Sequence, residues 1–367
     1  MDDVRVSTIE LFFDLVFVFT ITQLTSVLVA EPTATGAARV VLIFGNLWWM
    51  YGGYAWLTNA VPPTEPGLRL LMLVGMAAYL VVALSIPRAF GEAGIAFGLG
   101  YLVVNVVHAG MFMRSTQESA VRAIRRLGPM NVVTAALLLA AGWTHGSLRW
   151  GMWTGSFVLH WISPAFTAVG GFRIRAAHFV ERHGLIVLIA LGESVVAVGL
   201  GVQHRRITLG LVVNAVLGLA LAAALWWLYF DSEDERAERA LDDAPDARNP
   251  WLSLYAFGYA FLPVLTGIVV LAAGMRLSIV RYGHPSTTAG AWFLAAGVAA
   301  YAAGLALFRA ILRTGPPSLR VALAAAALAT APLGLWVSAE SQIAALTALV
   351  AAAIVTETRV RLRPAAP

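Results

Sequence analysis

Two carboxylates lie one helical turn apart near the start of the chain. Glu10 and Asp14 are four residues apart in a segment of Leu, Phe and Val, so a helix would place both on one face. Two ionised carboxylates at that spacing repel each other, which predicts a site that holds a proton or a small cation. Asp14 is the deeper of the two and is flanked by Phe residues. Glu10 lies only about one turn inside and could instead be solvated, or favourably placed, in the first turn of the helix.

A second polar cluster interrupts a long apolar stretch in the middle of the chain. Its members are His178, Glu181, Arg182, His183, Glu193 and Ser194. On a continuous helix His178, Arg182 and Glu193 fall within about 60° of one another, so they could line one wall of a cavity. Glu193 is the strongest candidate because Gly192 beside it would let a neighbouring helix approach. The alternative for Glu193 is a protonated carboxyl, or a pair with an Arg or His of another helix.

The histidines of this second cluster do not have the spacing of a zinc site. Helical zinc motifs of the form H-E-x-x-H or H-x-x-E-H place both histidines on one face. His178 and His183 are five residues apart, about 140° round a helix. The chain also lacks a P-loop, a dinucleotide fingerprint, a serine elbow and any Lys for a Schiff base. We therefore expect no metal and no cofactor at these residues.

The elements that position these residues are predicted by composition. Of 367 residues 59% are hydrophobic and only 12% are charged, which leaves too little polar surface to cover the apolar part in water. A bilayer can solvate such a chain if every backbone polar group is paired, as it is in helices or in a closed barrel. The apolar runs are long and continuous, which favours helices over the short alternating strands of a barrel. The absence of cysteine excludes disulfides and thiolate sites.

Apolar runs of roughly 20 residues predict an all-α, polytopic membrane protein with about twelve transmembrane helices. A count of ten or eleven is also compatible with the sequence, because two of the runs are short and the last two are rich in Ala. The predicted spans are residues 8–29, 38–59, 68–87, 91–113, 127–143, 147–169, 185–202, 207–230, 252–274, 288–312, 318–337 and 341–358.

Arginine predicts the orientation of these spans. With twelve spans, 18 of the 25 basic residues, all of them Arg, fall on the side of the two termini and 7 on the opposite side. Positive residues gather on the cytoplasmic side, so both termini are predicted to be cytoplasmic. This topology explains the basic charge better than a nucleic-acid partner does. The longest predicted loop, residues 231–250, is acidic, but acids count little in this rule.

A weak internal repeat suggests that the chain consists of two parallel halves. Residues 47–51 read LWWMY, and residues 225–229, six spans later, read LWWLY. A shift of six spans preserves orientation, as in parallel repeats about an axis along the membrane normal. The predicted halves are 1–175 and 176–367. The alternative is coincidence, because Trp and Tyr gather at membrane interfaces in any such protein.

Two single histidines, His108 and His160, lie inside predicted spans. A proton relay would use such residues. A neutral histidine that is hydrogen-bonded to a neighbouring helix is the commoner case, and Asn46, Asn105 and Asn131 are likewise expected to donate hydrogen bonds between helices.

The two polar clusters resemble the bacterial low temperature requirement protein A family. The resemblance lies in residues 6–19 (VSTIELFFDLVFVF) with 22–24 (TQL), in 178–184 (HFVERHG) with 192–194 (GES), and more weakly in 249–251 (NPW). It implies a multi-pass membrane protein named for a growth phenotype in the cold. It also strengthens the choice of Glu10, Asp14, Glu181, Arg182 and Glu193 without assigning them roles.

Three functional classes fit these observations. The leading hypothesis is transport of a small solute or ion, in a proton-coupled version through a polar cavity near the midplane, with Asp14 and Glu193 as protonatable groups. The second is a membrane-embedded enzyme that acts on a lipid or isoprenoid, with His178 and Arg182 beside the same acids. The third is a structural or sensory protein whose acids merely pair between helices. The expected partners are the lipid bilayer and a small solute or ion.

Overall fold

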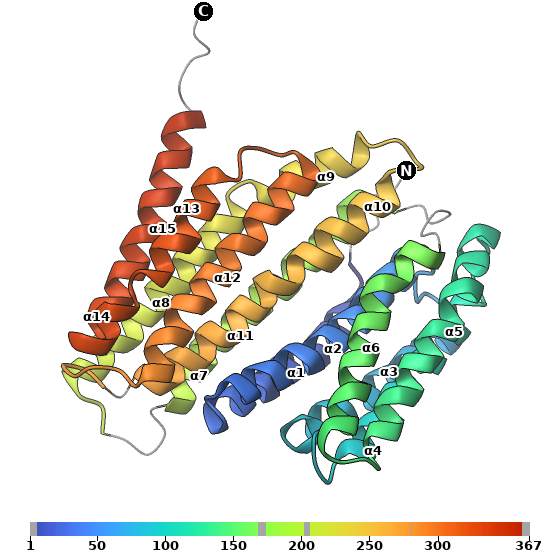
Figure 1. The fold of residues 1–367 in the computed structure, drawn as a ribbon. Helices are drawn as coiled ribbons and strands as arrows, with labels where there is room; N and C mark the ends of the chain where they lie inside the picture. Colours follow the sequence, from blue (N-terminus) through green and yellow to red (C-terminus); the bar gives the residue numbers. More distant parts are fainter. Residues whose placement is uncertain (1–5, 168–173, 202–205, 280, 362–367) are drawn as a thin grey trace, which may run out of the picture. The chain divides into compact units, whose positions relative to one another are not determined.

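The computed structural model describes residues 6–167, 174–201, 206–279 and 281–361, and these residues form helices without any strand. The predicted all-α class is therefore confirmed (Figure 1). The helices are α1 (Thr8–Ala30), α2 (Ala34–Ala60), α3 (Pro66–Ser85), η1 (Ile86–Arg88), α4 (Gly94–Phe112), α5 (Glu118–Ala141), α6 (Gly146–Thr167), α7 (Ala176–Gly201), α8 (Leu209–Phe230), α9 (Glu233–Asp242), α10 (Asn249–Ser253), η2 (Leu254–Ala260), α11 (Phe261–Ser278), α12 (Thr288–Leu312), α13 (Ser318–Leu328), α14 (Ala331–Trp336) and α15 (Ala339–Arg361).

Ten helical segments within the described part of the chain are long and apolar enough to cross a membrane. The prediction of a polytopic helical membrane protein is thus confirmed. Helices α2 and α6, with 27 and 22 residues, coincide with the two remaining predicted spans. They are not among the ten, and both are rich in Trp and Gly rather than in Leu and Val. The total of twelve spans stays a prediction.

Three predicted boundaries are wrong for physical reasons. Helix α7 begins at Ala176 instead of 185, because the polar residues of its first two turns are paired inside the protein and do not end the helix. Helix α5 begins at Glu118 instead of 127, and the arginines of its first turns are exposed. The predicted loop 231–250 contains the helix α9, which has three acids in its first turn, where the helix dipole favours negative charge.

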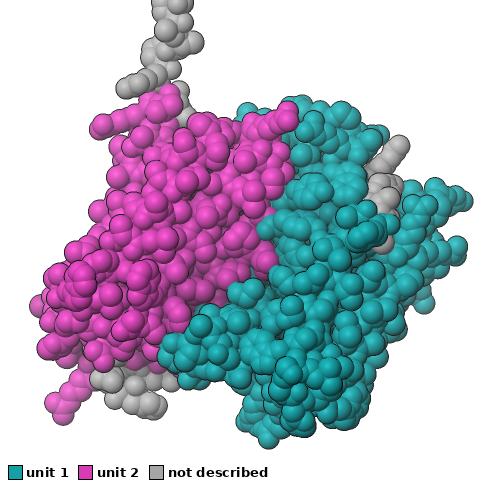
Figure 2. Space-filling model, in the orientation of Figure 1, with its two compact units in different colours: residues 1–186, 238–259 teal, residues 187–237, 260–367 magenta. Residues whose placement is uncertain are grey.

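The chain forms two compact units, shown in different colours in Figure 2. Unit 1 comprises residues 1–186 and 238–259, and unit 2 comprises residues 187–237 and 260–367. In unit 1, α1 packs against α2 and α3, and each helix from α3 to α6 packs against the next. In unit 2, α8 packs against α15, and α12 packs against α11, α13, α14 and α15. The predicted division into repeated halves 1–175 and 176–367 stays a prediction.

Glycines allow α11 and α12 to pack closely in unit 2. A Cβ atom on Gly267 would lie 2.6 Å from the carbonyl oxygen of Gly297, and one on Gly297 would lie 2.5 Å from the backbone nitrogen of Leu271. Small residues at helix contacts are typical of membrane bundles, where backbones approach each other through van der Waals packing.

Candidate functional site

Helix α1 buries both carboxylates of the first cluster on the stripe that faces the interior of unit 1. The buried positions include Glu10, Phe13, Asp14 and Phe17, which recur at helical spacing. Glu10 Oε2 accepts hydrogen bonds from the backbone N–H of Ser7 at 2.9 Å and from its hydroxyl at 2.6 Å, so Glu10 also helps to begin the helix. Glu10 is therefore favourably placed in the first turn, as the alternative expected, but it is not solvated, because its side chain is only 2% exposed.

Arg182 of α7 lies between the two carboxylates. Its Nη2 atom is 3.2 Å from Asp14 Oδ1, and its Nη1 atom is 3.3 Å from Glu10 Oε1. The Asp14 and Arg182 side chains are both 0% exposed. The predicted acid pair and one member of the second cluster therefore form a single buried site, although they are 168 residues or more apart in sequence.

Helix α2 completes the surroundings of the guanidinium. Arg182 Nη1 donates to the Thr58 hydroxyl and to the Tyr54 carbonyl oxygen, the latter at 3.3 Å. The guanidinium carbon lies 5.6 Å from the centres of the Phe13 and Tyr51 rings, which is within cation–π range. No sequence pattern points to Tyr54 or Thr58 as members of the site, whereas Tyr51 belongs to the aromatic motif of residues 47–51.

His178 extends the site toward the end of α1, and its surroundings define its tautomer. The amide of Asn59 is fixed by the Arg175 backbone, because its Oδ1 accepts from Arg175 N–H and its Nδ2 donates to the Arg175 carbonyl, both at 3.0 Å. Asn59 Nδ2 also lies 3.3 Å from His178 Nδ1, and an amide nitrogen can only donate. The ring proton of a neutral His178 is thus on Nε2, which faces Glu10 Oε1 at 3.1 Å.

The charges of this site, which we call the Arg182 cluster (Glu10, Asp14, His178 and Arg182), do not balance when His178 is neutral. Two ionised carboxylates then face one guanidinium, and the net charge is −1. An uncompensated charge is costly at such depth, so a proton on His178 or on a carboxylate, or a bound cation, would balance the cluster. Asp14 Oδ2 and Arg182 Nε are buried without a hydrogen bond of normal geometry to any described residue, although the Tyr51 hydroxyl lies beside Asp14.

A pocket of about 270 Å³ in unit 1 reaches the outer side of the Arg182 cluster. Glu10 and His178 line it, together with Thr64 and Arg69, whose exposed side chains mark its outer rim. Asp14 lies one turn further along α1, as the seventh residue of a 23-residue helix. Glu10 is thus close to the first residue of α1, and Asp14 lies between that end and the middle of the helix. The expected position of Asp14 near the midplane stays a prediction.

The remaining predicted residues lie elsewhere. Glu181 is exposed and accepts a hydrogen bond from the Val6 backbone at 3.3 Å. Glu193 and Ser194 are 3% and 2% exposed and belong to the part of α7 in unit 2. His178 lines the 270 Å³ pocket and Arg182 does not, so the proposed common wall of His178, Arg182 and Glu193 stays a prediction.

A second buried charge cluster, in unit 2, was missed by the sequence analysis. Arg309 Nη1 lies 2.8 Å from Glu357 Oε1, Arg309 Nε donates to Glu233 Oε1 at 2.9 Å, and Arg320 Nη2 lies 2.9 Å from Glu357 Oε2. Both arginines, which were counted among the 18 on the side of the termini, are buried, because Arg309 is 3% and Arg320 is 1% exposed. Two acids and two guanidinium groups balance in this cluster, which favours a structural role.

His160 makes the contacts that were expected of a buried histidine. Its Nε2 lies 2.7 Å from the Thr134 hydroxyl on α5, and its Nδ1 lies 3.1 Å from Asn46 Oδ1 on α2. The predicted hydrogen bonds to neighbouring helices are confirmed. The expectation that Asn46 and Asn105 donate between helices is wrong, because their amide nitrogens donate to Leu42 and Tyr101 of their own helices. Asn131 Oδ1 accepts a hydrogen bond from Trp49 of α2.

Comparison with known proteins agrees with this picture. Residues 5–355 match the family model described as bacterial low temperature requirement A protein. The uncharacterized protein RA0937 of Rhizobium meliloti (strain 1021) is 29% identical over 301 residues, which cover 77% of this chain and 71% of that protein. No solved structure matches the chain. Since the family match spans nearly every residue, including both segments that build the Arg182 cluster, the chain belongs to the bacterial low temperature requirement A protein family.

Proposed function

We propose that the protein transports a small solute or ion across the bacterial cytoplasmic membrane and that this transport is coupled to protons. The observation that carries the proposal is the burial of two carboxylates, one guanidinium and one histidine beside an open pocket. Ionisable groups inside membrane proteins commonly mark ion pathways and proton relays. A purely structural ion pair needs no such access from outside.

The arrangement suggests an order of events. A proton or cation would reach Glu10 and His178 through the pocket, and a proton on Asp14 would remove one of the two attractions that hold Arg182. Arg182 would then be held mainly by Glu10 and by α2, so that α1 and α7 could adopt a second arrangement. A change of charge that biases two packed states is a general basis for switching.

Glu193 is the second protonatable group of the proposal. It is buried in α7 next to Ser194, at a depth where an acid is costly unless it has a partner or reaches water. Its contribution can be tested separately from that of the Arg182 cluster, because Glu193→Gln changes its charge and hardly its size.

The test is reconstitution of the full chain in liposomes that contain a pH-sensitive dye, with a panel of ion and solute gradients. We expect substrate-dependent proton movement in the wild type and its loss in Asp14→Asn and Glu10→Gln. The matched control is Glu118→Gln, an exposed acid paired with Arg122 on the surface of α5. Vesicles that stay tight across the whole panel would contradict transport. An Asp14→Asn variant that loses yield and thermal stability, with no selective loss of flux, would assign the cluster to folding.

A second candidate is an enzyme that acts on a lipid or isoprenoid. The observation in its favour is the pair of His178 and Glu10 on the wall of the 270 Å³ pocket, because a histidine oriented by a carboxylate can act as a general base. Lipid profiling of a deletion strain grown in the cold separates the candidates. A missing lipid product that returns with wild type and not with His178→Gln would favour the enzyme.

A further inference from the structure

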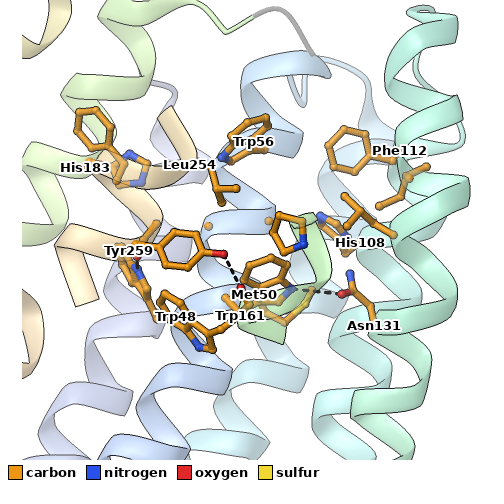
Figure 3. A pocket seen from close by; sticks show the side chains of 18 residues that line it. Trp48, Met50, Trp56, His108, Phe112, Asn131, Trp161, His183, Leu254 and Tyr259 are labelled. Carbon is orange, nitrogen blue, oxygen red and sulfur yellow. Dashed lines mark hydrogen bonds between the residues drawn. The ribbon is translucent and has the colours of Figure 1, made fainter. Parts of the chain in front are cut away.

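Unit 1 contains a cavity of about 90 Å³ that is separate from the Arg182 cluster and is walled largely by aromatic rings (Figure 3). The rings come from Trp48, Trp49 and Trp56 on α2, Trp161 on α6 and Tyr259 on η2, with His108 of α4 opposite. A single water needs only about 10–15 Å³ by this measure, so the cavity has room for a larger guest. Trp49, Trp56, Trp161 and Tyr259 are only partly buried, so the cavity opens to the surroundings.

Hydrogen bonds fix several of these rings. Trp48 Nε1 donates to the Gly258 carbonyl at 2.8 Å, Trp49 Nε1 donates to Asn131 Oδ1 at 3.2 Å, and the Tyr259 hydroxyl donates to the Trp161 carbonyl at 2.5 Å. The last two bonds are drawn in Figure 3. Since the walls are held in place, the cavity is preorganised, as small-molecule sites generally are.

Two polar groups at the cavity have unused hydrogen-bonding capacity. The indole N–H of Trp161 is buried and has no partner among the residues that the structure describes. His108 is only 4% exposed, and at least one of its ring nitrogens is likewise left without a partner there. Buried polar groups are normally satisfied, so an N–H that is left over beside a cavity points to an acceptor supplied by a ligand.

The lining also defines the charge of the guest. The described residues around the cavity include no Asp, Glu, Lys or Arg, so a charged guest would have no counterion. A quaternary ammonium ion is attracted by aromatic faces, but it offers no acceptor to the Trp161 N–H. A neutral planar ring that stacks on the indoles and carries a carbonyl oxygen satisfies both requirements.

We propose that this aromatic cavity binds a neutral, lipophilic, quinone-type molecule, with a ring carbonyl that accepts a hydrogen bond from Trp161 Nε1. The proposal does not depend on transport, because no member of the Arg182 cluster lines the cavity. Gly52 offers a direct test. A Cβ atom at Gly52, which lines the cavity, would meet nothing within 4 Å, so a larger side chain can fill the space without a clash at the backbone.

The experiment uses the full chain in lipid nanodiscs and a decyl-substituted benzoquinone as the probe. Binding to the wild type, Gly52→Leu and Gly110→Leu is followed by quenching of Trp fluorescence. Gly110 is the control, since it lies on α4 outside the cavity and a Cβ there also meets nothing within 4 Å. We expect saturable quenching in the wild type and in Gly110→Leu, and its loss in Gly52→Leu. Quenching that is unsaturable, or equal in all three proteins, would show mere partitioning and overturn the proposal.

Two further measurements test the chemistry of the ligand. Trp161→Phe keeps a ring and removes the N–H, and by calorimetry it should weaken binding about three- to tenfold, the value of one neutral hydrogen bond. Trp292→Phe, an exposed position on α12, should leave the affinity unchanged. A decylbenzene probe without carbonyl groups that binds as tightly as the quinone would overturn the assignment, and so would a decyl trimethylammonium probe that binds more tightly.

Discussion

Asp14 of α1 and Arg182 of α7 form an ion pair, 3.2 Å from Oδ1 to Nη2, in which neither side chain has any exposed surface. Removal of both charges from water is costly, and the cost is offset only while the partners stay together. The pair therefore links two helices that are distant in sequence, and it makes each charge dependent on the other.

Loss of Arg182 should destabilise the protein more than loss of either acid. Arg182→Met leaves Glu10 and Asp14 buried without their guanidinium, and removal of one partner of a buried pair costs about 3–5 kcal/mol. The melting temperature of the purified protein in detergent should fall accordingly. The double variant with Asp14→Asn and Arg182→Met should regain part of the lost melting temperature, because one fewer buried charge is then left without a partner. An Arg182→Met protein as stable as the wild type would show that the pair contributes nothing.

The cluster of unit 2 should behave differently from the Arg182 cluster. Arg309→Met leaves Glu233 with a weaker partner, and we expect a comparable loss of stability of about 3–5 kcal/mol. Proton flux per folded molecule should stay unchanged, because this cluster is already neutral. The measurement is proton flux in liposomes, normalised to folded protein, for Arg309→Met and for Asp14→Asn. Only Asp14→Asn should lose flux. A selective loss of flux in Arg309→Met would place the second cluster in the pathway as well.

His178 should be the Nε2–H tautomer. Asn59 donates to Nδ1, so the ring proton faces Glu10. Solid-state NMR of ¹⁵N-histidine-labelled protein should report a protonated Nε2 and an unprotonated Nδ1 for His178. Asn59→Leu should relax this preference, whereas Asn46→Leu, beside His160, should not. An Nδ1–H signal from His178 in the wild type would contradict the assignment.

Orientation in the membrane can be tested because the chain contains no cysteine. Thr64 lies at the rim of the 270 Å³ pocket, and Glu92 lies in the connection between α3 and α4. Each can be replaced by a single cysteine, as Thr64→Cys and Glu92→Cys. The arginine distribution predicts that Thr64 is cytoplasmic and Glu92 is on the opposite side. A membrane-impermeant maleimide added to intact spheroplasts should label Glu92→Cys only, and inverted vesicles should give the reverse. Labelling of Thr64→Cys from outside would contradict the predicted orientation and would mean that the 270 Å³ pocket opens on the opposite side of the membrane.

The fold was largely predictable because hydropathy and helical periodicity are local properties. Long apolar runs gave the all-α class and the approximate spans, and the spacing of Glu10 and Asp14 placed both on one face of α1. The predicted start of α7 was wrong, because hydropathy alone ends a span where polar residues begin. The rule does not detect that Arg182 and His178 have partners on another helix, and such partners let the apolar environment continue past them.

The pairs themselves could not be predicted, because they depend on tertiary structure. Nothing in the sequence near Arg309 distinguishes a buried arginine from one that marks a cytoplasmic loop, and its partners Glu233 and Glu357 are 76 and 48 residues away. The same holds for Arg182 and Asp14. Positive residues near helix ends thus serve as topology markers, and some of them are also internal counterions.

The seven π-helical residues of η2 have a consequence for the continuous helical stretch from α10 to α11. Each turn of a π-helix takes up more residues than a turn of an α-helix, and such turns commonly coincide with functional sites. The angular register of Asn249–Ser253 therefore does not carry over to Phe261–Ser278. A deletion of one residue within Leu254–Ala260 would allow ordinary α-helix to form. It would also rotate the Gly258 carbonyl away from Trp48, so the shape of the aromatic cavity depends on the length of this short segment.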